Sequence, residues 1–527
     1  MNTRYLLFTY LICILSIIGG LWNSQFINDG YHWGFIYSNS LDLIHGKKPY
    51  NEIFLEYGLL QSLINLIIIK FINNSVYSIQ AFTVLIYAFS LFILNRVILN
   101  ITSNHRLSFF SVLIIFLINP WSYSPWPIYL VFFFSLLFIF FYLKESKKDS
   151  IIAGLFLFFA YLSYSTIFNF TFILFILLFF FKFYLLKFNK ISTNKTNNYF
   201  FLITFVFLFL VFLVYLNLNG IFFEWIKFQT IPFLIKDSLN YSFIDLVKEY
   251  TYFIFFEPIF KMVYEPQWLI YSILFIFNIL SINLFIKKIF TKNITNKEIK
   301  IFSIILFIFT LNFFGQVKTL MYLSCSLSMG IISFAIIYNK MKNTEDKIII
   351  IFIFTFLTIF SLFNFDMKFS KNADGRFKSV KFLMDKENKI INNDFKYFKY
   401  FKWDKNYWKF LKNHNDKINV IKDNCDNIEG VNLTDDTFLY ILIGKQTFQK
   451  IPFFLDSSAH ELNNIFDSTL KNEIQIKLNH DSIFLISHKN NEENFNFSNN
   501  YETKKIYKKT SKTIAEEFRL IFPKKCN

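Results

Sequence analysis

The chain of 527 residues is 54% apolar and 22% aromatic but only 17% charged, a composition that excludes an ordinary soluble enzyme and a disordered tail. Its charges divide unevenly: residues 1–365 carry 26 basic and 15 acidic side chains, whereas residues 366–527 carry 28 and 22. The sequence therefore predicts two parts, a membrane domain at residues 1–365 and a water-exposed domain at residues 366–527.

Eleven apolar runs are predicted to cross the membrane as helices. They lie at residues 5–21, 76–99, 107–119, 128–143, 151–164, 168–186, 199–218, 267–286, 301–315, 322–338 and 348–363. Several are shorter than the roughly 20 residues that span the hydrocarbon layer, so we expect these helices to include polar flanks. Another run, at residues 59–72, is short and contains Gln61, Asn65 and Lys70. We expect it to form a helix at the outer face of the membrane.

Basic residues recur in every other predicted loop. With the N-terminus inside, the predicted cytoplasmic segments hold 18 basic and five acidic residues, and the external segments before residue 366 hold eight and ten. Lys and Arg near short loops are retained on the cytoplasmic side. The predicted protein is therefore a multi-pass protein of the inner (plasma) membrane, with residues 22–75 and 366–527 outside the cytoplasm. Because this topology accounts for most of the net charge of +17, no nucleic-acid partner is predicted.

The external C-terminal domain is predicted to be a small α/β domain. Strand-like runs lie at residues 418–421, 438–443 and 482–487, helix-like runs lie at 379–385, 458–471 and 513–520, and residues 488–501 read as a loop. Cys425 and Cys526 lie in this domain and could pair in an oxidising compartment, but two cysteines do not establish the geometry of a bridge. No His and Cys grouping has the spacing of a zinc site.

The first external segment carries the strongest pattern for chemistry. It reads NDGYHWG at residues 28–34, GKKPY at 46–50 and EYG at 56–58. Asp29 lies a few residues beyond the first predicted helix, at the headgroup boundary, where a lipid-borne substrate and water can both reach it. A carboxylate there can remove a proton from a hydroxyl nucleophile. We expect Asp42 and Glu52, by contrast, to lie on a solvated helix face.

This pattern, an early external Asp followed by a helix, then Gly-x-x-Pro-Tyr and Tyr-Gly, resembles the GT-C glycosyltransferases. The branch it resembles includes the aminoarabinose transferase and relatives of the protein O-mannosyltransferases. The resemblance implies a polytopic fold, a polyprenyl-phosphate-linked sugar as donor, and Asp29 as the base that activates the acceptor hydroxyl with inversion at the anomeric carbon. Many relatives carry a pair of acids where this chain has one, so the use of a divalent metal ion stays open.

The leaving phosphate requires positive charge, and the external lysines are candidates to bind it. Lys318 is preferred because relatives often carry a basic residue before a late helix, and Lys47 and Lys48 are further candidates. The remaining predicted substrate-binding residues are His32, Tyr50, Glu56 and Tyr57.

Each of these residues also has a purely structural interpretation. Asp29 could end a helix at the interface, and His32 could be a packed side chain in an aromatic cluster. Glu56 and Tyr57 could anchor the surface helix, and Lys318 could extend its ammonium to the membrane surface.

Three other functions remain open. A transporter or flippase for lipid-linked sugars would carry ionisable residues inside several helices, and the predicted helix centres here hold almost none. A surface-polysaccharide polymerase would be expected to have a large basic loop between crossings in place of a C-terminal domain. A receptor or scaffold without catalysis is the third alternative.

Overall fold

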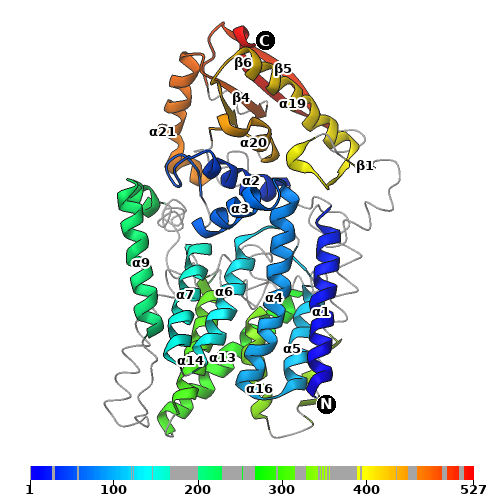
Figure 1. The fold of residues 1–527 in the computed structure, drawn as a ribbon, viewed down its shortest axis with the longest axis vertical. Coiled ribbons are helices and arrows are strands. Elements are labelled where there is room, and N and C mark those ends of the chain that lie inside the picture. Colours follow the sequence, from blue (N-terminus) through cyan, green and yellow to red (C-terminus); the bar gives the residue numbers. More distant parts are fainter. Residues whose placement is uncertain are drawn as a thin grey trace.

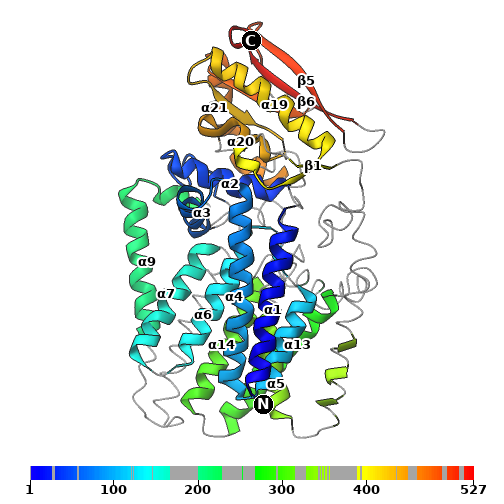
Figure 2. The same cartoon turned by 45° about the vertical axis from the view of Figure 1, so that its right-hand side comes forward.

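The computed structural model places a helical bundle at one end of the molecule and a small sheet-containing module at the other (Figure 1). It describes residues 2–25, 30–55, 58–119, 121–122, 124–144, 146–165, 200–227, 248, 252, 267–291, 295–314, 328–341, 345, 347–348, 350–352, 355–356, 389–391, 395–434, 436–448, 460–488, 495–509 and 515–527. In both views the N-terminus lies at the end of the bundle that is remote from the module (Figures 1 and 2).

Nine of the eleven predicted crossings coincide with helices in the described part of the chain. They are α1 (Asn2–Asn23), α4 (Val76–Thr102), α5 (His105–Ile118), α6 (Pro127–Tyr142), α7 (Lys147–Ser163), α9 (Phe200–Leu218), α13 (Gln267–Thr291), α14 (Asn296–Phe314) and α16 (Gly330–Lys340). The run predicted at 168–186 lies outside the described residues, as does most of the run at 348–363. The total of eleven crossings therefore stays a prediction.

Side-chain caps fix where several of these helices begin. Ser75 Oγ accepts a bond from the backbone N–H of Ser78 at the start of α4, and Ser146 Oγ does the same for Asp149 at the start of α7. Each cap satisfies a donor that the helix itself leaves unpaired. Pro127 occupies the first turn of α6, where its missing N–H costs no helical hydrogen bond.

The bundle is apolar outside and partly polar inside, as expected of a membrane protein. On α1 and α9, Leu7, Ile18 and Phe207 are each more than 60% exposed, whereas Thr9 and Ser16 of α1 are fully buried. Exposed apolar stripes face lipid, and small polar residues pack between helices in membrane proteins. In the described residues, α1, α4 and α9 are long and apolar enough to cross a membrane.

The predicted cytoplasmic loops meet at the end of the bundle where the N-terminus of the chain lies. Lys300 Nζ of α14 donates to the carbonyl oxygen of Lys144 at 2.7 Å, and the Asn339 side-chain amide of α16 donates to that of Thr102 at 3.3 Å. Lys288, at the end of α13, pairs with Glu298 of α14. Basic segments that are far apart in the sequence therefore share one end of the bundle, as the alternation of charged loops requires.

Two short helices lie at the opposite end, between the bundle and the module: α2 (Gly30–Ile44) and α3 (Leu59–Phe71) (Figure 1). The polar side chains of Gln61 and Asn65 in α3 are buried, while Ile67 and Phe71 are exposed. Exposed apolar and buried polar faces suit a helix at the edge of a membrane, which is the position expected from the sequence for residues 59–72.

The C-terminal module contains two small sheets. The first pairs β1 (Lys389–Ile391) with β2 (Lys402–Asp404). The second has the order β3-β4-β6-β5, where only the β3–β4 pair is parallel. Its strands are β3 (Glu429–Asn432), β4 (Ile483–His488), β5 (Tyr501–Lys509) and β6 (Ala515–Pro523). The helices are η3 (Lys396–Phe398), α19 (Lys405–Asn424), α20 (Phe438–Ile443), η4 (Gly444–Gln446), α21 (His460–Asn479) and η6 (Lys524–Cys526).

Three element types predicted for this module are wrong. Residues 418–421 belong to α19, because Phe410, His414, Ile418 and Ile421 bury one face at helical spacing. Residues 438–443 form α20, an apolar run buried on every side, which periodicity alone does not distinguish from a strand. Residues 513–520 contribute to β6, because pairing with β4 and β5 overrides the helix preference of the Ala and Glu residues.

The remaining predictions for the module agree with the structure wherever it is described. Residues 482–487 lie in β4, residues 458–471 largely in α21, and residues 495–500 form no helix or strand. The helix predicted at 379–385 lies outside the described residues. Cys425, directly after α19, forms a disulfide with Cys526 in η6, which settles the pairing that the sequence left open.

Candidate functional site

The helix α2, which directly follows Asp29 in the sequence, is enclosed by the rest of the protein. Trp33, Phe35, Tyr37, Ser40 and Asp42 are each almost fully buried, although they point to different sides of the helix. A helix buried all round packs against other elements on every face. Here the bundle lies on one side and the C-terminal module on the other (Figure 1).

The end of α2 explains the GKKPY motif. Gly46 has a φ of +85°, a left-handed conformation that favours glycine. Its N–H donates to Leu43 O at 3.1 Å, and the N–H of Lys47 donates to Asp42 O at 3.1 Å, which together form a Schellman cap. Tyr50 also has a positive φ, of 64°, and is buried. The motif therefore reverses the chain at the end of α2.

Asp42 is buried, which corrects the prediction of a solvated helix face. Its side chain is 1% exposed, and Oδ1 lies 2.9 Å from Lys47 Nζ. Lys47 Nζ also donates to the carbonyl oxygen of Thr447 in the C-terminal module. This burial could not be predicted from the local sequence, because the module that meets this end of α2 is some 400 residues away along the chain.

Burial and, to a smaller extent, nearby Glu52 raise the pKa of Asp42 to about 7, although Lys47 opposes this shift. The Tyr440 phenol of α20 also lies near this carboxyl group. Burial and the ammonium groups of Lys47 and Lys445 lower the pKa of His45 at the same end of α2. The segment after Asp29 thus contains a carboxyl group that titrates near neutral pH.

This titration predicts a pH-dependent effect of Asp42→Asn on stability. The unfolded carboxyl ionises near 3.8 and the folded one near 7, so its stabilising contribution is complete below about pH 4 and is lost as pH rises through about 7. The thermal midpoint of Asp42→Asn minus that of wild type should therefore become more positive between about pH 5 and about pH 8. Exposed Asp416→Asn is the reference for the change in net charge. A difference that stays constant across this range would contradict the argument.

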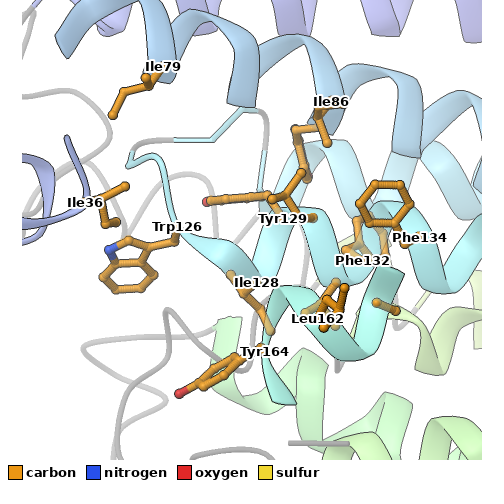
Figure 3. Close-up of a cluster of buried hydrophobic side chains, with 14 of the residues drawn as sticks. Ile36, Ile79, Ile86, Trp126, Ile128, Tyr129, Phe132, Phe134, Leu162 and Tyr164 are labelled. Atoms are coloured by element: carbon orange, nitrogen blue, oxygen red, sulfur yellow. The ribbon is translucent and has the colours of Figure 1, made fainter. Parts of the chain in front are cut away.

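On the bundle side, α2 rests on a cluster of large side chains. Figure 3 shows Ile36 of α2 beside Trp126, with Ile79 of α4 and Tyr129 in the same cluster and Tyr164 at its far edge. All five are buried. This packing fixes α2 to the bundle through apolar area, since buried aromatic side chains contribute most of the contact surface.

A polar layer lies beside this apolar cluster, in the connection between α5 and α6. The side-chain amide of Gln80 donates to Ser122 O at 3.0 Å, and that of Gln61 donates to Pro125 O. The Ser122 and Ser124 hydroxyls are buried without a hydrogen-bond partner in the described residues. The connection is thus held by α3 and α4 and presents polar groups near the first external segment.

The structure places only part of the predicted site. Lys48 is exposed, its backbone N–H donates to Glu52 Oε2 at 2.7 Å, and His32 lies in the first turns of α2. Asp29, Glu56, Tyr57 and Lys318 lie outside the described residues. Gly58 N–H donates to Ser163 O at 3.1 Å, which joins the EYG motif to the end of α7. The described residues contain no group of three or more His, Cys, Asp or Glu that could hold a metal ion.

Comparison with known proteins finds similarity at the level of the fold. No family model and no curated protein matches the sequence. Among solved structures, the Archaeoglobus fulgidus oligosaccharyltransferase tethered to an acceptor peptide with an NVT sequon matches with a TM-score of 0.52 and 12% identity, over 92% of this chain and 69% of that chain. Its apo form matches with a TM-score of 0.51 and 12% identity, over 93% and 69%. The fold of this membrane protein is therefore similar to that of this oligosaccharyltransferase.

Proposed function

We propose that the protein is an inverting glycosyltransferase that moves a sugar from a polyprenyl-phosphate donor to an extracytoplasmic acceptor. Asp29 is the general base in this proposal. It removes the proton of the acceptor hydroxyl, whose oxygen attacks the anomeric carbon while the polyprenyl phosphate leaves from the opposite face.

One observation carries the proposal. The helix directly after Asp29 is held between the end of the bundle and the C-terminal module, in a chain whose fold is similar to that of an oligosaccharyltransferase over 92% of its length. The Asp29 carboxylate is proposed to lie at this junction, where a donor in the outer leaflet and an acceptor in water can meet. The transporter alternative lacks such an observation in the described residues.

The phosphate of the donor is assigned to lysines of the external side. Lys47 already pairs with Asp42 and bonds to Thr447 O, so its ammonium is committed to the junction. Exposed Lys48 and the predicted external Lys318 therefore remain to stabilise the leaving phosphate. His32, Tyr50, Glu56 and Tyr57 are proposed to contact the sugar or the acceptor.

The orientation proposed is the one predicted from the basic loops. The N-terminal end of the bundle, where Lys144, Lys288 and Lys300 meet, faces the cytoplasm, and the module at residues 366–527 lies outside the bacterial inner membrane. The disulfide between Cys425 and Cys526 supports this side, because disulfides persist in oxidising compartments.

The acceptor is a lipid, a glycan or a protein. The solved oligosaccharyltransferase carries an acceptor peptide with an NVT sequon, so a protein acceptor must be tested alongside the others. A deletion strain and its parent should be compared by mass spectrometry of lipid-linked, polysaccharide and protein-linked glycans. We expect one sugar residue to be missing from one class and to return when the wild-type gene is restored. Identical glycans in both strains would refute the proposal.

A further inference from the structure

One of the contacts between the C-terminal module and the start of α2 is made by a short turn. Residues 436–438, here called the docking turn, lead into α20. The backbone N–H of Phe35 donates to Thr437 Oγ1 at 3.1 Å, and Thr437 is fully buried. A Cβ added to Gly34 would lie 2.5 Å from the carbonyl carbon of Thr437, so only glycine permits this approach of helix and turn. Both contacts fall within two turns of Asp29 along the chain.

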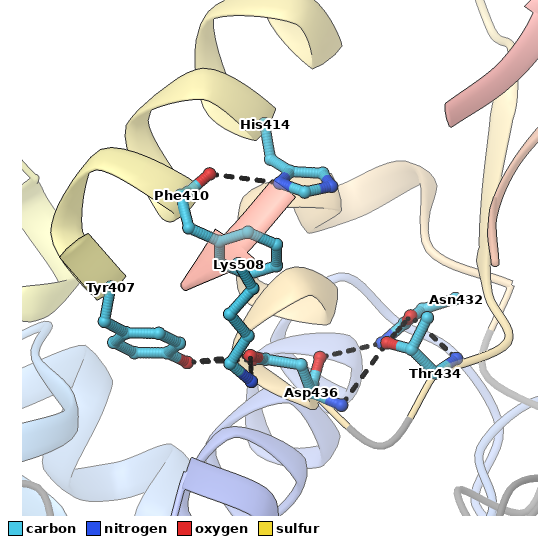
Figure 4. A network of polar contacts seen from close by, with 7 residues as sticks. All are labelled: Tyr407, Phe410, His414, Asn432, Thr434, Asp436 and Lys508. Carbon is cyan, nitrogen blue, oxygen red and sulfur yellow. Dashed lines mark hydrogen bonds and ion pairs between the residues drawn. The ribbon is translucent and has the colours of Figure 1, made fainter. Parts of the chain in front are cut away.

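An ion pair to a buried carboxylate supports the docking turn. Asp436, whose side chain is 2% exposed, accepts hydrogen bonds from the Tyr407 hydroxyl and from Lys508 Nζ, each at 2.9 Å. Tyr407 belongs to α19 and Lys508 to β5, so two separate elements converge on one carboxylate (Figure 4). A buried carboxylate requires such partners, because an unpaired charge away from water is costly.

The partners of Asp436 are themselves fixed. The ammonium of Lys508 lies 5.2 Å from the ring centre of Tyr407 and 5.5 and 5.6 Å from those of Phe410 and Phe518. Rings at these distances attract a cation through their faces. The ammonium of Lys508 is therefore held among aromatic side chains, which fix its position beside Asp436.

The backbone of the docking turn is held as well. The Asn432 side-chain amide donates to the carbonyl oxygen of Asp436 at 2.9 Å, and Asn432 Oδ1 accepts from the N–H of Thr434 at 3.1 Å (Figure 4). Asn432 is the last residue of β3, which belongs to the four-stranded sheet of the module. The turn is thus tied to the sheet by its backbone and to α19 and β5 by its carboxylate.

We propose that Asp436, together with Tyr407 and Lys508, is a positioning group for the transfer reaction. It holds Thr437 against Gly34 and Phe35 and so fixes the start of α2, which directly follows Asp29. The module then contributes to catalysis by placing the base, in addition to any contact with the acceptor. This role rests on the proposed function, because the network positions a catalytic base only if Asp29 is that base.

The test uses two pairs of matched variants of the full chain in lipid nanodiscs. Thr437→Val removes the hydroxyl that accepts from Phe35 at nearly constant volume, and Thr437→Ser keeps a hydroxyl. Tyr407→Phe removes one donor to Asp436, and Tyr507→Phe removes a phenol from an exposed site on β5. Hydrogen exchange of residues 30–44 and the kinetics of sugar transfer are measured for each variant.

Thr437→Val should exchange amides in the first turns of α2 roughly fivefold faster than wild type, as expected for one lost hydrogen bond. Its kcat should fall by about tenfold to a hundredfold, while KM for the donor stays within about twofold, because a misplaced base slows the chemical step. Tyr407→Phe should change both quantities in the same direction by a smaller factor. Thr437→Ser and Tyr507→Phe should match wild type.

The outcomes separate this proposal from the proposed function. Unchanged exchange in Thr437→Val and Tyr407→Phe, in a protein that transfers sugar, would overturn the positioning role alone. An increase in KM at constant kcat would assign the docking turn to substrate recognition and would also overturn it. A wild-type protein that transfers no sugar would overturn the proposed function, and the catalytic role of Asp436 with it, while the exchange data would still establish or refute the contact with α2.

Discussion

Asp29→Asn is expected to lower sugar transfer by about 10²- to 10⁴-fold, the usual contribution of a positioned general base. The amide has nearly the shape of the carboxylate but does not accept a proton near neutral pH, so the acceptor hydroxyl would attack unassisted. Donor binding should change little, because the carboxylate acts on the acceptor. Transfer from a purified polyprenyl-phosphate sugar, followed by mass spectrometry, measures the loss.

Glu224→Gln is the matched control for Asp29→Asn. Glu224 is a half-exposed acid on the predicted external side that pairs with Lys227 at 3.0 Å, and its replacement should leave transfer within about twofold of wild type, as is usual for exposed ion pairs. Thermal midpoints of both variants show whether the fold is intact. If Asp29→Asn retains full turnover in a folded protein, Asp29 is not the base.

The second large effect is expected on the C-terminal module when its disulfide is removed. Cys425 and Cys526 are separated by 101 residues, so the bridge closes a long loop in the unfolded chain. For a loop of about 100 residues, the loss of this restraint should lower the free energy of unfolding by about 4.7 kcal/mol in the chain-entropy account. The double variant Cys425→Ala/Cys526→Ala should therefore show increased hydrogen exchange in β4, β5 and β6 at a lower denaturant concentration than wild type.

Two controls separate the bridge from the side chains. Cys13→Ala removes the buried free cysteine of α1 and should leave the module unchanged. A reducing agent should destabilise the wild-type module to the level of the double variant and should have no further effect on that variant. Equal stability of wild type and double variant under oxidising conditions would contradict the expected contribution.

The helices of the membrane domain could be predicted from the local sequence. A helix such as α1 or α4 is specified by a continuous apolar run, because each residue in lipid must satisfy its backbone within the same segment. The observed helix ends differ from the predicted ends by a few residues, because caps such as Ser75 and Ser146 are single residues beside those runs. The alternation of basic loops likewise predicted which ends lie together, and Lys144 meets Lys300 as a result.

The C-terminal module was less predictable, because contacts across the sheet decide its elements. Residues 513–520 were predicted to form a helix from local preference, but the described part of this run lies in β6 and pairs with β4 and β5. Residues 438–443 are apolar on every side and so carry no period that distinguishes helix from strand. Local preference is a weak guide wherever burial is complete or a partner strand is available.

The candidate site shows the same division. The motifs around Asp29 and at residues 46–50 marked the first external segment, and Gly46 occupies a turn that requires a positive φ. The prediction that Asp42 lies on a solvated helix face was wrong, since its neighbours in sequence suggest an ordinary exposed face. The fold brings Tyr440 close to it and Thr447 into contact with its partner Lys47, both across some 400 residues.

The sequence by itself determined that most of this chain lies in a membrane, where its helices lie and which segment carries the candidate base, because hydrophobic runs and charge bias act locally. The tertiary structure alone decided that α2 is enclosed, that Asp42 is buried and that Asp436 supports the docking turn. Those properties arise when distant segments exclude water from one another, and the free energy of a buried charge depends on that exclusion far more than on its neighbours along the chain.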